Sequence, residues 1–448
     1  MNGDRNEVSL ADTEPAPPAR SPLGFREHAD RPDVLGELHA RPLLPLAPPR
    51  RVYHFAFMTS PEEARADRDT VVSLARQRGV PPPASDAKFH RFDFGDWELR
   101  WEQHTEFTTY TWTTAREASE PFARPNPLAA GEFAFTAPGD LIVAAHLSLL
   151  DMGPQPRDYG RHFQRQGLCV IEAADEAAVV ATDFLADANG FTRILVESRG
   201  MTEMRSGRLA QRVLELETYR TLALLGLPLA RRTGPHLQRM ETELSAIIRE
   251  IAARPDAERN QQLLGRLGRL AAELEAQSAD TAFRFSATRA YHTLVKSRLD
   301  LIAEKPVGEY VTVTAFFRRR LDPAIETCNA VEVRQNRLAA QQARTADLLR
   351  TGIQFDLEEQ NRDLLRSMDR RARMQLRLQQ TVEGLSVAAI SYYVVGLVGY
   401  LAKGMKDAKA LPASIDPSVL TALSVPFAIA GVWWLVARVR RRVHKDAP

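Results

Sequence analysis

The sequence predicts an α+β cytoplasmic head, a long α-helical stalk and a C-terminal two-helix transmembrane hairpin. Three observations support this fold class. The first 200 residues contain alternating runs rich in aromatic and β-branched residues, apolar residues recur at helical spacing from Ser206 onward, and two uncharged runs lie at 384–402 and 417–437. The chain has 448 residues and 44% hydrophobic content, which is enough for two or three compact units.

The N-terminal residues 1–20, MNGDRNEVSLADTEPAPPAR, are polar and contain prolines. They lack the apolar core of a secretory signal, so we predict a disordered tail and a chain that begins in the cytoplasm. The only cysteines, Cys169 and Cys328, are far apart and lack metal-site spacing, which fits a reducing compartment. A net charge of +2 does not require a nucleic-acid partner, and we expect none.

The head is predicted to span residues 21–200 and to mix strands with helix. The segment 51–59, RVYHFAFMT, has the composition of a strand, and 88–114 predicts two or three antiparallel strands with a turn at Gly95-Asp96. Another apolar run of strand length covers 140–150. The remainder predicts a strand in LCVIEA, a helix over 175–190 and a strand over 191–198.

Amphipathic helices are predicted from residue 206 to residue 303, in segments that include 234–254, 256–277 and 279–303. A long stalk helix follows over 307–383, and its part from Ala324 to Val382 would measure roughly 90 Å. An imperfect heptad marks its apolar stripe, for which we expect a homo-oligomeric coiled coil. The stripe consists of Leu349, Ile353, Leu357, Leu364, Met368, Leu378 and Val382.

The runs 384–402 and 417–437 each have the length that a bilayer requires, and 403–416 would be the periplasmic loop between them. Basic residues cluster outside this hairpin, both before it and in the tail 438–448. The positive-inside rule therefore places both termini in the cytoplasm of a bacterial inner (plasma) membrane, and the same clusters can bind anionic lipid headgroups. They comprise Arg370, Arg371, Arg373, Arg377, Arg438, Arg440, Arg441 and Arg442.

Polar side chains interrupt the first predicted span at Ser386, Ser391, Tyr392 and Tyr393. Hydroxyl groups are tolerated in membrane helices, where they pair with a neighbouring helix or line a path. We interpret these four as helix-packing residues.

A candidate motif near the N-terminus places Glu37, His39 and Arg41 at alternate positions. In a helix, Glu37 and Arg41 would form an ordinary surface pair, whereas in an extended segment all three would share one face and could form a site. Prolines at 42, 45, 48 and 49 favour a rigid strap on the surface of the head.

Catalytic signatures are missing from the sequence. No glycine-rich phosphate loop and no nucleophile motif occurs, and we interpret the histidines at 54, 90, 104 and 146 in the predicted strands as structural. We therefore expect no enzyme activity and no cofactor.

Three stretches resemble a family of uncharacterised, mostly proteobacterial proteins described as predicted membrane-anchored proteins. They are SPLGFREHADRP with GELHARP, RLAQRVLELETYRTLALLGLPLAR, and EEQNRDLLRSMDRRARMQLRLQQTVEGLSVAAISYYVVGLVGYLAKG. The resemblance implies location and layout without an activity. The architecture alone also resembles the CorA-type magnesium channels, but the Gly-Met-Asn motif of that family is replaced here by Gly404-Met405-Lys406.

These observations predict a membrane-anchored cytoplasmic scaffold or sensor that associates with itself. The alternative is a divergent CorA-like ion channel or transporter. A membrane-tethered enzyme is a weaker alternative.

Overall fold

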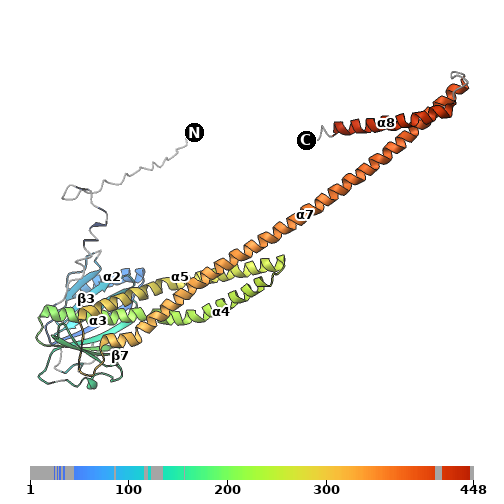
Figure 1. Ribbon diagram of the computed structural model, residues 1–448. Helices are drawn as coiled ribbons and strands as arrows, with labels where there is room; N and C mark the ends of the chain where they lie inside the picture. Colours follow the sequence, from blue (N-terminus) through green and yellow to red (C-terminus); the bar gives the residue numbers. More distant parts are fainter. Residues whose placement is uncertain are drawn as a thin grey trace, which may run out of the picture. The chain divides into compact units, whose positions relative to one another are not determined.

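The computed structural model (Figure 1) describes residues 25, 28, 30, 31, 34, 35, 45–84, 87–115, 120–122, 135–155, 157–408 and 416–443. The predicted tail 1–20 lies outside these residues. The chain divides into two compact units. Unit 1 comprises Met1–Arg249 and Arg266–Ala343, and unit 2 comprises Glu250–Gly265 and Arg344–Pro448.

Unit 1 is built on a sheet with the strand order β2-β3-β4-β1-β5-β8-β7-β6-β9. Neighbouring strands are antiparallel except for β5 and β8, which are parallel. The strands are β1 (Arg50–Met58), β2 (Phe89–Asp93), β3 (Glu98–Gln103), β4 (Phe107–Thr114), β5 (Asp140–Asp151), β6 (Cys169–Ala173), β7 (Ala178–Ala186), β8 (Thr192–Ser198) and β9 (Lys305–Pro306). The predicted strands at 51–59, 88–114, 140–150, 168–173 and 191–198 are therefore confirmed.

The helix predicted over 175–190 is wrong, because this segment forms the central strand β7 of a meander with β6 and β8. Its alanines favour a helix, but Val179 and Val180 are β-branched and both are buried in the sheet. Left-handed backbone at Ala174, Asp175 and Glu176 turns the chain tightly into β7. Tertiary pairing thus overrides the local propensity.

Helix α2 (Pro61–Arg78), which the sequence analysis missed, packs on one face of the sheet. Its start is a capping box: the Ser60 hydroxyl accepts a hydrogen bond from the Glu63 amide, while the Glu63 carboxylate accepts one from the Ser60 amide. The helix ends at Gly79, which adopts the left-handed conformation. Ser60, Glu63 and Gly79 are therefore signals in the sequence for the start and the end of this helix.

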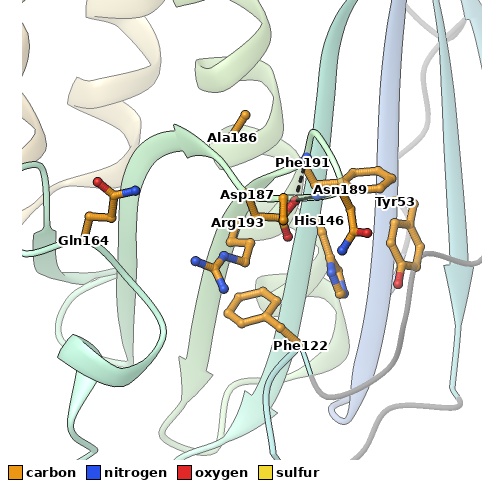
Figure 2. Close-up of a pocket in the computed structure, with 10 residues that line it drawn as sticks. Tyr53, Phe122, His146, Gln164, Ala186, Asp187, Asn189, Phe191 and Arg193 are labelled. Atoms are coloured by element: carbon orange, nitrogen blue, oxygen red, sulfur yellow. Dashed lines mark hydrogen bonds between the residues drawn. The ribbon is translucent and has the colours of Figure 1, made fainter.

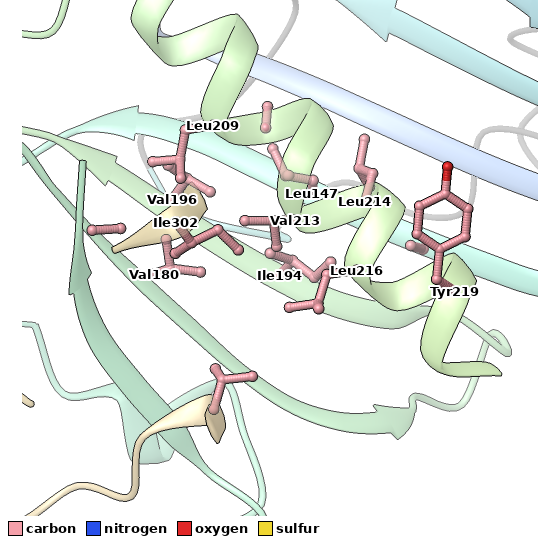
Figure 3. Packing of buried hydrophobic residues seen from close by; sticks show 14 of the residues in the cluster. Leu147, Val180, Ile194, Val196, Leu209, Val213, Leu214, Leu216, Tyr219 and Ile302 are labelled. Atoms are coloured by element: carbon pink, nitrogen blue, oxygen red, sulfur yellow. The ribbon is translucent and has the colours of Figure 1, made fainter. Parts of the chain in front are cut away.

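Hydrophobic cores cover both faces of the sheet. On one face, helix α3 (Glu203–Leu224) places Leu209, Val213 and Leu216 against side chains of β5, β7 and β8 (Figure 3). On the other face, an aromatic core that includes Trp101 packs against Val71 of α2, and a smaller core lies over β6 and β7. Alternation along each strand divides its side chains between these cores.

The helical part of the chain comprises α3, α4 (Gly226–Ala252), α5 (Ala257–Ile302), α6 (Val313–Arg320), α7 (Asp322–Asp407) and α8 (Pro417–Val443), with a short 3-10 helix η1 (Tyr159–Arg161) in the head. The segments predicted at 256–277 and 279–303 form the single helix α5. The predicted stalk begins with α6 and continues as α7, which runs without a break through the first apolar run.

Within unit 1, α4 and α5 pack against the first part of α7. The Gln342 side chain donates to the Leu267 carbonyl at 2.7 Å, Arg334 forms an ion pair with Glu241 at 2.7 Å, and Leu338 is buried. The same chain therefore covers the beginning of the long helix, which removes part of the reason to expect that copies must meet there.

Unit 2 holds the later part of α7 and the helix α8. The predicted stripe residues Leu357, Leu364, Met368, Leu378 and Val382 are all more than half exposed. Two helical stretches in the described part of the chain are long and apolar enough to cross a membrane: Val313–Asp407, which joins α6 and α7 and includes the first run, and Pro417–Arg438 of α8. The fold class is thus an α+β head with a long helix and a terminal apolar helix.

Candidate functional site

A row of three polar or aromatic side chains crosses the centre of the sheet. In the strand register, Tyr53 of β1 lies opposite His146 of β5, and His146 lies opposite Arg193 of β8. Residues directly opposite each other on neighbouring strands project from the same face, so the three side chains lie side by side. The Tyr53 and His146 rings stack with their centroids 4.3 Å apart.

A cavity of about 440 Å³ opens beside this row (Figure 2). The turn between β7 and β8 supplies Asp187, Ala188 and Asn189 to its lining, and Gln164 and Phe122 come from two loops. The volume lies in the range of small-molecule sites. The cavity is lined by Tyr53, Phe122, His146, Gln164, Ala186, Asp187, Ala188, Asn189, Phe191 and Arg193.

The histidine in this cavity is a buried, neutral group. Burial, followed by the positive charges of Arg51 and Arg193, lowers the pKa of His146 to about 3. The residue is 5% exposed, and its Nε2 atom has no hydrogen-bond partner in the described part of the chain. A buried polar atom in this state needs a water or a ligand in the cavity.

Arg193 supplies a positive charge at the same place. Within the described ranges its guanidinium forms no ion pair, and its buried Nε has no hydrogen-bond partner. It lies over the rings of Phe122 and Phe163, at 5.7 and 5.9 Å from their centroids. These cation–π contacts hold the guanidinium in place without neutralising it.

The carboxylate of Asp187 is partly used to close the turn. One of its oxygens accepts hydrogen bonds from the amides of Asn189 (2.8 Å) and Phe191 (3.0 Å), as the dashed lines in Figure 2 show. The cavity therefore combines a cation that lacks an acidic partner, aromatic walls and amide groups. This arrangement can hold a small anion with a flat apolar part.

A second polar cavity, of about 220 Å³, lies between the other face of the sheet and α3. Its histidine is satisfied, since the two ring nitrogens of His54 lie 2.8 Å from the Thr111 hydroxyl and 2.9 Å from the Thr218 hydroxyl. Burial, with a smaller contribution from Arg100, lowers the pKa of His54 to about 3. His54 and His146 thus belong to opposite faces. No group of three or more metal-ligating side chains occurs among the described residues.

The candidate residues predicted from the sequence are placed as follows. Glu37, His39 and Arg41 lie outside the described residues, as do the side chains of Arg440, Arg441 and Arg442. Arg370, Arg371, Arg373 and Arg377 are exposed on α7, where Arg373 pairs with Asp369 at 2.6 Å, and Arg438 lies over the Trp434 ring. Of the polar residues in the first apolar run, Ser391 is buried, while Ser386, Tyr392 and Tyr393 are exposed.

The sequence analysis interpreted His146 as structural and missed the other residues of the cavity, because no local pattern indicates them. His146 and Arg193 are paired by the parallel contact between β5 and β8, which a sequence alone does not reveal. The available signal was modest: a histidine and an arginine at the centres of apolar strands, where charged side chains are seldom buried without a reason.

Fold and site together define a mixed-sheet head with a polar cavity, followed by a long helix whose last part is apolar and by a second apolar helix. The chain belongs to a family described as "Protein of unknown function (DUF3422)", whose model matches residues 26–443. No curated protein matches the chain. This agrees with the resemblance to an uncharacterised family and assigns no activity.

Proposed function

We propose that this protein is a membrane-anchored sensor that binds a small anion in the cavity of its head and associates with itself. The observation that carries the proposal is the pair Arg193 and His146, a cation without an acidic partner beside a buried imidazole nitrogen without a hydrogen bond, within the described residues. An anionic group would accept hydrogen bonds from the Arg193 guanidinium and from the Nε2–H tautomer of neutral His146, and would satisfy both.

The anchor in this proposal is the apolar hairpin in the bacterial inner membrane, with both termini in the cytoplasm. The exposed arginines at 370, 371, 373 and 377 precede the first span and would contact anionic headgroups. Self-association is supported by the exposed apolar side chains of α7 between Leu357 and Val382, because a solvated helix seldom carries so many.

The charge preference of the cavity can be tested with three ligands of similar shape: benzoate, neutral benzamide and cationic benzylamine. Full-length protein in detergent should bind benzoate best, as measured by ligand-observed NMR. Arg193→Gln should weaken benzoate binding about tenfold, because one charge-assisted contact is lost. The matched control is Arg161→Gln, since the Arg161 side chain is 80% exposed nearby and should not matter.

The affinity for benzoate should not change between pH 5.5 and pH 8. His146, with its pKa lowered to about 3, stays neutral over this whole range. A gain in affinity below pH 6.5 would show that the imidazole becomes charged. Equal binding of benzoate and benzamide would contradict the proposed anion site.

Topology is tested separately with a reporter that is active only in the periplasm. It should be silent when fused after Pro448 and active when inserted near Ala413, because the larger positive excess lies outside the hairpin. The opposite pattern would overturn the proposed orientation and would leave the cavity unaffected.

A further inference from the structure

Helix α8 covers one face of the first apolar run of α7. Ser391 and Ala402 of α7 and Val432 of α8 are buried, and a Cβ atom added to Gly399 would lie 3.4 Å from the Thr421 side chain. This face of α7 is therefore covered by α8 of the same chain.

A different set of residues lies on the face of α7 that points away from α8. At about 100° per residue, Tyr393 is turned roughly 200° from Ser391. Tyr393 is 72% exposed and Tyr400 is 79% exposed, and a Cβ atom on Gly396 would meet nothing within 4 Å. The residues at 386, 389, 393, 396 and 400 follow one another at spacings of three and four. We call this set, Ser386, Ala389, Tyr393, Gly396 and Tyr400, the span seam.

The exposed side chain of Tyr393 is energetically unfavourable because of its depth in the bilayer. It lies ten positions after Glu383 and ten positions before Lys403, the charged residues that flank the run. At 1.5 Å per residue, each flank is about 15 Å away, so the ring lies at the midplane of a bilayer core of about 30 Å. Tyrosine normally occupies the interface, where its hydroxyl is hydrated. A hydroxyl without a hydrogen-bond partner is unfavourable in hydrocarbon, where no water can pair with it.

We propose that the span seam is the contact surface between two copies of this chain within the membrane, with the Tyr393 hydroxyls hydrogen-bonded across it. Copies inserted in the same direction bring Tyr393 to the same depth. The small residues Ala389 and Gly396 allow the two backbones to approach closely. The three-four spacing is that of parallel helices with a left-handed crossing, and Val382 extends it into the stalk.

This inference rests on the proposed self-association and on the proposed anchor, and it assigns a surface to them. It does not depend on the cavity of the head. It also separates the two faces of one helix: Ser391 serves the contact with α8, while Tyr393 serves the contact with the second copy.

Adjacent alanines provide a matched test in the full-length protein. Ala389→Cys lies in the span seam, and Ala388→Cys is turned about 100° from it. In native membranes treated with copper phenanthroline, Ala389→Cys should give a disulfide-linked dimer and Ala388→Cys should give little. The native Cys169 and Cys328 are buried, so the unsubstituted protein provides the background. Equal cross-linking of the two variants would overturn the proposal.

Two further variants distinguish a wrong contact surface from a protein that does not associate with itself. Met368→Cys, on the exposed stripe of α7, reports association through the stalk. If Met368→Cys cross-links and Ala389→Cys does not, the span seam is refuted while self-association stands; if neither does, both are refuted. Tyr393→Phe should weaken the dimer about threefold, the effect of one average hydrogen bond between membrane helices.

Discussion

Replacement of Asp67 by alanine should lower the free energy of unfolding of the head by about 3 kcal/mol. The Asp67 carboxylate of α2 is 4% exposed. It accepts a hydrogen bond from Trp101 Nε1 at 2.8 Å and another from the Tyr110 hydroxyl. Alanine would leave both buried donors without an acceptor, and each lost partner costs roughly 1–3 kcal/mol.

The measurement is urea unfolding followed by tryptophan fluorescence. Trp97, Trp101 and Trp112 all belong to the aromatic core of the head, so a background with Trp433→Phe and Trp434→Phe reports on the head alone. Asp69→Ala provides the control, because Asp69 is exposed on the same helix and should change stability by less than about 0.5 kcal/mol. Equal effects of the two substitutions would show that the buried carboxylate does not anchor α2.

The contribution of Asp67 to the stability of the head should also depend on pH. Burial raises the pKa of Asp67, although its hydrogen bonds with Tyr110 and Trp101 act in the opposite direction. A pKa raised in the folded state gives a contribution to stability that is present below the unfolded pKa and is lost as the pH rises through the folded pKa. The stability difference between wild type and Asp67→Ala should therefore be larger in mild acid than at neutral pH.

The sequence predicted the strands well because burial on one or both faces leaves a direct pattern. Trp101 and Trp112 alternate with polar residues, and this period of two identified β3 and β4 correctly. The pattern failed at β7, where alanines dominate and the strand is defined by its neighbours. It failed at α2 for another reason, since the capping box at Ser60 was present and was overlooked.

The cavity could not be predicted in the same way. Tyr53, His146 and Arg193 are far apart in the chain and meet only because β5 pairs with β1 on one side and with β8 on the other. A shift of one residue in either register would send a side chain to the opposite face. The chemistry of the site is thus a property of the sheet topology, which residue spacing does not encode.

The apolar stripe of α7 predicts that the helix has a buried face, but it does not predict which element covers that face. Its apolar stripe identified a helix that needs partners, and the structure supplies partners for the first part through α4 and α5. Leu349 is buried and Leu357 is 54% exposed, so the coverage ends between them. Sequence periodicity reveals that a face is apolar, but the covering element follows from the tertiary fold.

A second large effect is expected at the ion pair that joins α5 to the sheet. Both guanidinium Nη atoms of Arg284 donate to the Glu106 carboxylate, at 3.1 and 2.6 Å, and the side chains are only 19% and 10% exposed. Glu106→Ala should cost about 3 kcal/mol, because it leaves a largely buried guanidinium without its partner. The exposed pair Arg239–Glu273 provides the contrast, and Glu273→Ala should cost less than about 1 kcal/mol.

A double-mutant cycle distinguishes the pair from simple packing. If Glu106 and Arg284 stabilise the fold by contacting each other, Glu106→Ala combined with Arg284→Ala should cost at least 1 kcal/mol less than the sum of the single changes. Additive effects would mean that each side chain acts through its apolar contacts instead. Since Glu106 lies in the β3–β4 connection, a strong coupling would show that this bidentate pair attaches α5 directly to the sheet.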